Sequence, residues 1–303
     1  YLNYTDFEEK ILHYRNKQYY SLFKKILDSG CENLNYSVVK GDALSKLAYG
    51  RVNQRFYNDV DVIVSRANLK ELNYILFKCG YVQREHSREE NILFLSASHQ
   101  TLPYTCKHNY LTIDINFDIL WGEYEGKRID IEEFLSDTIE MEIYGVKVKT
   151  LPPLKAMIQL ILHHYKDMNS LFLLATRKSI KYDMFKDVYY LLKNNLDAIS
   201  LDKLYAMSVE YEIIPYVFYV LCYTGQVFDD DILKQYIEAF RTPEGEALLN
   251  CYGLCEKERR EWKCDFKTRL DSDNLYDLIK EDLTERDKEK IAINKRVFLG
   301  ISE

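Results

Sequence analysis

The stretch VVKGDALSKLAYGRVNQRFYNDVDVIV, residues 38–64, decides the fold expected of this chain. It opens on the end of a short β-rich run, Tyr36–Val39, which delivers Lys40 and Gly41 to the start of a brief helix. It closes on DVDVIV, residues 59–64, where every second residue is a valine, the period-2 pattern of a strand. The segment therefore predicts a strand, a short helix and a second strand.

The first turn of this helix is expected to bind phosphate. Gly41 lets the backbone approach a ligand closely, and free N–H groups at the start of a helix attract phosphate. Arg55 lies four residues before Asp59, and its planar guanidinium can grip phosphate through two hydrogen bonds. We therefore expect Lys40, Gly41 and Arg55 to hold phosphate groups. An ordinary surface ion pair is the alternative for each of the two basic residues.

Two carboxylates share one face of the second strand. Asp59 and Asp61 are two residues apart, so they project from the same face while Val60 and Val62 point to the core. Neighbouring carboxylates repel each other unless a cation lies between them. Mg²⁺ takes oxygen ligands and commonly bridges substrate phosphates, so the pair predicts a magnesium site.

A third carboxylate is expected on a neighbouring strand, in TIDINFDILW (residues 112–121). In a strand over residues 110–120, Asp114, Asn116 and Asp118 share one face and apolar residues share the other. Asp114 could then complete a two-metal site that clamps the attacking and leaving oxygens. Asp118 is either a substitute for this third ligand or a surface acid.

The remaining periodicities predict a mixed α+β chain with a boundary near residue 150. Before it, helices are expected over residues 5–29, 43–49 and 69–79, further strands over 92–96 and 102–107, and a hairpin over 139–144 and 146–150. After Pro152 and Pro153, the expected helices cover residues 154–168, 181–194, 201–209, 215–223, 230–240 and 273–290. The prediction is an α/β domain over residues 1–150 with a short mixed sheet, followed by an all-helical domain over 151–303.

The net charge of −7 bears on the partners of the chain. Proteins that track a long nucleic acid usually carry the opposite balance, since Lys and Arg neutralise phosphates. The longest apolar stretch, residues 213–223, is too short to span a bilayer. A small molecule or a protein is therefore favoured over nucleic acid as a partner, and no membrane is expected.

The seven cysteines are scattered and odd in number, a pattern that favours a reducing cytoplasm over a disulfide framework. The group of Cys251, Cys255 and Cys264 does not match the common zinc spacings and has no nearby His to complete a site. These three are interpreted as thiols at helix positions.

These motifs together resemble the nucleotidyltransferase superfamily related to DNA polymerase β. More closely, they resemble a bacterial group labelled "uncharacterised nucleotidyltransferase", with L-K-G followed by R-x-x-x-D-[IV]-D. Lys40-Gly41 and Arg55 to Asp61 match these motifs, and Asp114 matches the third acid of the family. ILHHYKD (residues 161–167) resembles its L-H-x-x-K helix, and FKDVYYLL (residues 185–192) resembles a later helix containing Asp187.

The resemblance implies an enzyme that transfers a nucleoside monophosphate from an NTP, with ATP expected, to an acceptor hydroxyl, releasing pyrophosphate. It assigns catalysis and two Mg²⁺ ions, with Mn²⁺ as the alternative metal, to Asp59, Asp61 and Asp114. It assigns nucleotide binding to Lys40, Gly41, Arg55, His163 and Lys166. Two positions depart from the family pattern. Asp42 follows Gly41 where Gly or Ser is usual, and its carboxylate is expected to compete with a triphosphate for the N–H groups of the helix start. Asn116 stands where His is frequent.

Several alternatives stay open. The acceptor could be a small metabolite or antibiotic, a protein side chain or an RNA end. His163 and Lys166 could equally lie on a solvated helix face, and Asp187 is the more natural structural partner of a helix start or a basic residue. The rival function is a nucleotide-binding regulatory module, for example in a toxin–antitoxin pair, with little or no turnover. Three clustered acids argue against it, because a pocket released from catalysis has no chemical need for them.

Overall fold

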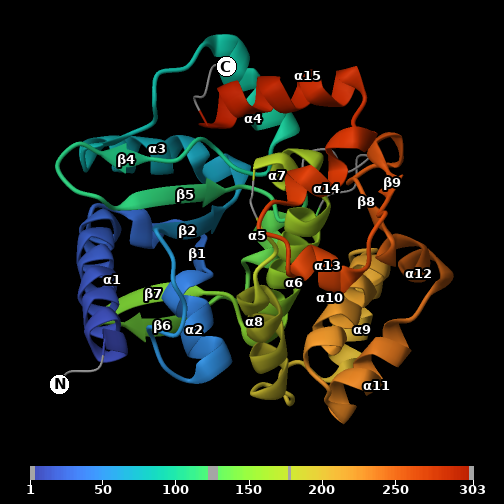
Figure 1. The fold of residues 1–303 in the computed structure, drawn as a ribbon. Helices are drawn as coiled ribbons and strands as arrows, with labels where there is room; N and C mark the ends of the chain where they lie inside the picture. Colours follow the sequence, from blue (N-terminus) through green and yellow to red (C-terminus); the bar gives the residue numbers. More distant parts are fainter. Residues whose placement is uncertain (1–3, 122–128, 177–178, 300–303) are drawn as a thin grey trace. The chain divides into compact units, whose positions relative to one another are not determined.

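The computed structural model describes residues 4–121, 129–176 and 179–299 (Figure 1). The chain divides into two compact units. Of the described residues, 4–121 and 129–156 belong to the first unit, and 157–176 and 179–299 belong to the second.

Within the described residues, the first unit contains a five-stranded mixed sheet in the order β5-β2-β1-β7-β6 (Figure 1). Strand β2 pairs antiparallel with β1 and parallel with β5, and β7 pairs parallel with β1 and antiparallel with β6. The strands are β1 (Tyr36–Val39), β2 (Asp59–Val64), β5 (Thr112–Asn116), β6 (Ile139–Ile143) and β7 (Val146–Thr150). This short mixed sheet confirms the α+β class predicted from the sequence.

One face of this sheet carries the hydrophobic core. Helices α1 (Tyr4–Asp28) and α3 (Leu69–Lys78) contribute buried side chains that cluster with those of the strands. From β2, the side chains in this cluster are those of Val60, Val62 and Val64. Because strand side chains alternate between faces, the acids of β2 lie on the face opposite this core.

The hairpin between β6 and β7 forms where the sequence predicted it. Its turn consists of Tyr144 and Gly145, with φ values of 50° and 78°. Positive φ at both central residues gives a turn whose twist matches that of the flanking strands. Gly145 takes this conformation without strain, so its position between two β-rich runs identified the turn correctly.

The strand predicted over residues 92–96 is wrong, because these residues belong to helix α4 (Arg88–Ala97). A reciprocal capping box precedes the helix. Ser87 Oγ accepts a hydrogen bond from the Glu90 backbone N–H at 3.1 Å, and Glu90 Oε2 accepts one from the Ser87 backbone N–H at 2.8 Å. These bonds start a helix that the apolar run alone does not reveal.

Two further strands are shorter than predicted. The segment expected over residues 102–107 contains only β4 (Thr105–Cys106), which pairs with β3 (Tyr81–Val82). Strand β5 ends at Asn116 rather than near residue 120. Beyond that point the backbone N–H groups of Phe117 and Asp118 both donate to His99 O, at 2.9 and 3.2 Å, so the strand pairing stops there.

The second unit is mainly helical. Its helices include α6 (Pro153–Asn169, which begins in the first unit), α7 (Leu171–Thr176), α8 (Tyr182–Lys193), α9 (Leu201–Glu210), α10 (Ile214–Val227), α11 (Asp231–Phe240), α12 (Pro243–Leu249), α13 (Phe266–Leu270), α14 (Leu275–Ile279) and α15 (Glu285–Asn294). In the described part of the chain, no helix is both long enough and apolar enough to cross a bilayer.

The prediction of an all-helical second domain needs two corrections. Strands β8 (Cys251–Tyr252) and β9 (Arg260–Glu261) form a short antiparallel ladder. The single helix predicted over residues 273–290 is divided into α14 and α15. The division follows from a capping box at Thr284, whose side chain and backbone exchange hydrogen bonds with Asp287 and so start a new helix.

Candidate active site

The parallel pairing of β2 with β5 places the candidate acids side by side. Asp61 stands directly opposite Asp114, and Asp59 stands opposite Thr112. Directly paired residues of neighbouring strands point to the same face of the sheet. Asp61 is 8% exposed, one oxygen of Asp114 is buried, and Asp59 is half-buried. The sheet therefore gathers the three acids on one face, two along a strand and one across from them.

A basic side chain already lies against these acids. Val39, the last residue of β1, pairs with Asp61, and Lys40 follows it directly. The Lys40 Nζ atom lies 2.7 Å from Asp61 Oδ1, with both side chains largely shielded from solvent. The ammonium balances part of the negative charge that the paired carboxylates of Asp61 and Asp114 create.

The backbone of Lys40 and Gly41 adopts an unusual conformation at the start of helix α2 (Gly41–Tyr49). The φ values are 56° at Lys40 and 43° at Gly41, and a positive φ is uncommon for a residue other than glycine. Such outliers often occur at functional sites. Lys40 is the N-cap residue, and its ammonium cannot accept a hydrogen bond from the first turn. The start of α2 is thus a place where an anion is favoured.

Asp42 does not act as the sequence suggested. It was expected to compete with phosphate for the N–H groups of the helix start. Its fully buried carboxylate instead accepts hydrogen bonds from the Tyr57 hydroxyl and, at 2.5 Å, from the Asn53 backbone N–H. Burial raises the pKa of Tyr57 well above its usual range, with the Asp42 charge contributing, so the phenol stays a donor. Asp42 therefore ties the loop before β2 to α2.

The same loop is held from α1 by two residues that sequence reasoning missed. Arg15 donates to the Tyr57 carbonyl, and its guanidinium lies 4.7 Å from the centre of the Phe56 ring. Asn16 Nδ2 donates to Asn53 Oδ1 at 3.1 Å. Arg15 and Asn16 are far from these partners in the sequence, and no local motif predicts the contacts. They fix the backbone on either side of Arg55, which is itself half-buried.

Asp118 lies outside the strand that carries Asp114. Asp118 lies beyond the end of β5, and its Oδ1 accepts a hydrogen bond from the Leu120 backbone N–H at 3.0 Å. This local bond gives Asp118 a role in the turn. Asn116, in contrast, remains within β5 and is 6% exposed. Among the described residues, its buried Nδ2 has no hydrogen-bond partner.

His163 and Lys166 lie on α6 in the second unit. His163 Nε2 is 3.1 Å from Asp167 Oδ2, and Lys166 Nζ is 3.9 Å from Asp167 Oδ1. Their side chains are only 17% and 11% exposed, so neither lies on a solvated face. Asp187, on α8, is likewise buried. The assignment of His163 and Lys166 to the nucleotide stays a prediction from the resemblance.

Comparison with known proteins decides the family. The family described as "Uncharacterised nucleotidyltransferase" matches residues 8–229. The chain belongs to this family. Comparison with solved structures gives a match to the solution structure of the antibiotic-resistance factor ANT(2'')-Ia, at 14% identity and a TM-score of 0.39, covering 64% of this chain and 92% of that one. No curated protein sequence shows significant similarity to the chain.

Membership in this nucleotidyltransferase family supports transfer of a nucleoside monophosphate as the general chemistry, with a divalent cation as the usual class of cofactor. The side chains on the acid-bearing face suit such a cation. Asp59, Asp61 and Asp114 offer only oxygen donors, the type that Mg²⁺ prefers. The short distance from Lys40 Nζ to Asp61 Oδ1, 2.7 Å, shows that positive charge is stabilised at this position.

Proposed function

We propose that this nucleotidyltransferase moves a nucleoside monophosphate from an NTP, with ATP as the expected donor, to an acceptor hydroxyl and releases pyrophosphate. One observation carries this function: Asp61 and Asp114 stand opposite each other on neighbouring strands, and Lys40 reaches Asp61 from the start of α2. The arrangement places an acidic pair next to a site that favours anions, as attack on a triphosphate requires.

Asp59, Asp61 and Asp114 are the residues that would hold Mg²⁺, or Mn²⁺ in its place. Bound there, the ions would neutralise charge on the phosphates and on the leaving pyrophosphate. All three acids belong to β2 and β5, so the backbone of the sheet holds them in position. Sites built on strands are positioned more precisely than sites built on loops.

The residues around the acids have separate roles in this proposal. Lys40 and the N–H groups near Gly41 bind the triphosphate, and Arg55 clamps it through its planar guanidinium. Asp114 accepts the proton of the acceptor hydroxyl. The acceptor oxygen forms a bond to the α-phosphorus while the bond to the bridging oxygen of pyrophosphate breaks. Asn116, whose Nδ2 is buried on the same face, is the donor that we assign to the acceptor side.

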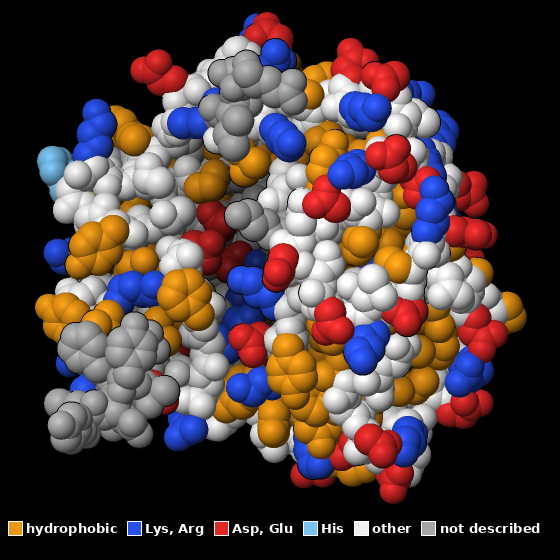
Figure 2. Space-filling view, viewed as in Figure 1, with side chains coloured by type: hydrophobic (Ala, Val, Ile, Leu, Met, Phe, Trp, Pro, Cys, Tyr) orange, Lys and Arg blue, Asp and Glu red, His pale blue; other side chains and the backbone are white. Residues whose placement is uncertain are grey.

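A small molecule or a protein side chain is the acceptor that we propose. The net charge of −7 disfavours a long nucleic acid as the acceptor, because binding its phosphates requires an excess of Lys and Arg. Figure 2 shows Lys and Arg side chains interspersed with Asp and Glu side chains over the helical unit on the face in view. We also propose a reducing cytoplasm as the location, because seven scattered cysteines do not suit a disulfide framework.

Two measurements test this function. The protein is incubated with each NTP labelled at the α-phosphate and with an extract of the source cells, and labelled products are separated. We expect one NTP to label one class of acceptor, with pyrophosphate released and Asp114→Asn inactive. Calorimetric titration with Mg·NTP, run in parallel, distinguishes an enzyme from the regulatory alternative. Tight binding with neither pyrophosphate nor labelled product would favour the regulatory module.

A further inference from the structure

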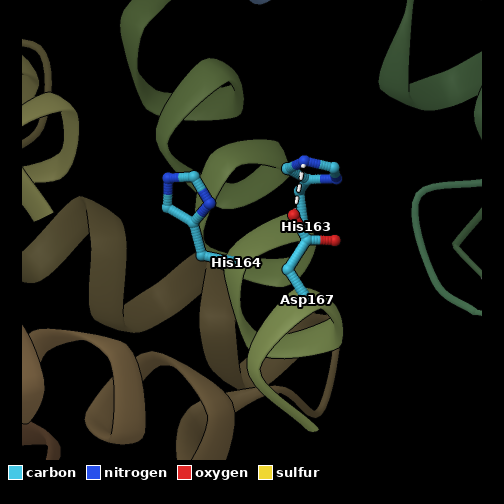
Figure 3. Close-up of side chains that lie close together, drawn as sticks. All are labelled: His163, His164 and Asp167. Carbon is cyan, nitrogen blue, oxygen red and sulfur yellow. Dashed lines mark ion pairs between the residues drawn. The ribbon is translucent and has the colours of Figure 1, made fainter. Parts of the chain in front are cut away.

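A second group of candidate metal ligands lies on α6, apart from the acids of the sheet. His163, His164 and Asp167 each offer a ligand atom, and these atoms all lie within 4.8 Å of one another. Figure 3 shows the three side chains on adjacent turns of the helix, with the His163 ring beside the Asp167 carboxylate. All three residues belong to the second unit.

The distances are close to those of a bound transition metal. Ligand atoms held about 2.0–2.1 Å from a tetrahedral ion are about 3.3 Å apart. His163 Nε2 and Asp167 Oδ2 are already 3.1 Å apart. The ring centres of His163 and His164 are 5.7 Å apart, and two imidazoles on one such ion have centres about 5–6 Å apart. A side-chain adjustment of about 1 Å would bring all three ligand atoms within reach of one ion.

Burial makes this group unusual for a helix surface. His164 is 4% exposed and Asp167 is 6% exposed. A carboxylate that is removed from water interacts strongly with a nearby cation, since little solvent screens the charges. Lys166 approaches Oδ1 of Asp167, whereas His163 approaches Oδ2.

We propose that His163, His164 and Asp167 bind one transition-metal ion of the zinc type. Imidazole ligands suit Zn²⁺, Fe²⁺, Co²⁺ and Ni²⁺, whereas Mg²⁺ prefers ligand sets of oxygen alone. The site thus differs in chemistry from the acids of β2 and β5. Three protein ligands leave a further coordination position for water or an external ligand. The proposal does not depend on nucleotidyl transfer.

The test uses the full chain after removal of metals. Zn²⁺ is titrated calorimetrically, and Co²⁺ is added in a parallel sample to record its visible absorption spectrum. In excess MgCl₂, which would occupy the acids of β2 and β5, we expect one Zn²⁺ per chain and a Co²⁺ spectrum of a low-symmetry site with nitrogen ligands. His164→Gln and Asp167→Asn should each lower Zn²⁺ affinity at least about tenfold. His108→Gln is the matched control, because His108 is exposed and lies in the first unit.

Three results would overturn the site: Zn²⁺ failing to bind, binding that His164→Gln and His163→Gln both leave unchanged, or displacement of Zn²⁺ by equimolar Mg²⁺. Cooperative thermal unfolding of each variant shows that a lost affinity does not come from a lost fold. Asp61→Asn separates this proposal from the proposed function. It should abolish transfer while Zn²⁺ affinity is retained, so each proposal can fail without the other.

Discussion

The Nζ atom of Lys40 lies 2.7 Å from Oδ1 of Asp61, and that aspartate stands opposite Asp114 in the next strand. An internal cation thus sits at the acidic pair. Phosphate and the carboxylate compete for this ammonium, whereas a divalent ion and the ammonium compete for the carboxylate. Binding of Mg·NTP is therefore expected to move Lys40 from Asp61 to the phosphates.

Lys40→Met tests whether the ammonium offsets the negative charge of Asp61 and Asp114. The methionine keeps an apolar stem but leaves Asp61 and Asp114 without the ammonium, so their repulsion grows. We expect the free energy of unfolding in EDTA to fall by about 1–2 kcal/mol. MgCl₂ should then stabilise the variant more than it stabilises the wild-type protein. Urea unfolding of both proteins in EDTA and in MgCl₂ measures this. If MgCl₂ stabilised the variant and the wild-type protein equally, Lys40 would not offset the charge of the acids.

Asp114→Asn tests the acid assigned to the acceptor. The amide keeps the shape but removes the charge needed in the transition state. Turnover should fall by several orders of magnitude, while affinity for Mg·NTP changes less than about tenfold. Asp118→Asn is the control and should stay active, because an amide oxygen can still accept from the Leu120 N–H. Pyrophosphate release and nucleotide affinity are compared for both. Loss of turnover in the control alone would transfer the role to Asp118, and activity in both would place the third acid elsewhere.

Arg55→Ala tests the phosphate clamp. If Arg55 donates charge-assisted hydrogen bonds to the triphosphate, its loss should weaken NTP binding by about 1.5–3 kcal/mol. Arg51→Ala is the control from the same loop, since Arg51 is exposed and its Nη2 donates to Gln54 Oε1 at 2.9 Å. Calorimetric Kd values of the two variants decide the matter. If Arg55→Ala bound NTP with the same affinity as the wild-type protein, the alternative of an ordinary surface ion pair would be favoured for Arg55.

Tyr104 should make the fold sensitive to alkali. Burial raises its pKa from 10.0 to about 12. A pKa that is raised in the folded state stabilises the protein below the unfolded value, and this stability is lost as the pH rises from about 10 to about 12. Relative to Tyr104→Phe, the wild-type protein should lose about 1 kcal/mol between pH 9 and pH 11. Urea unfolding at these two pH values tests this. Tyr182→Phe, at a residue 51% exposed, is the control and should behave like the wild-type protein.

Local patterns in the sequence determined much of the first unit. The alternation in Asp59–Val64 decided which side chains share a face, because the side-chain period of a strand is two and needs no distant partner. Gly145 between two β-rich runs predicted the hairpin, because glycine takes the positive φ of the turn without strain. The match of Lys40-Gly41 and of the Arg55-to-Asp61 motif led to the family that the comparison then showed.

Only the tertiary structure decided which groups meet across the chain. The pairing of Asp61 with Asp114 depends on the register of β2 and β5, which distant residues set by hydrogen bonding. Asp42 is buried and accepts a hydrogen bond from the Tyr57 hydroxyl, a partner on the loop before β2, so its sequence position beside a helix start was misleading. Helix spacing alone put His163 and Asp167 on one face of α6, but their shielding from water required the packing of other helices. Periodicity can be recognised in the local sequence alone, whereas strand register, burial and charge partners are properties of the whole fold.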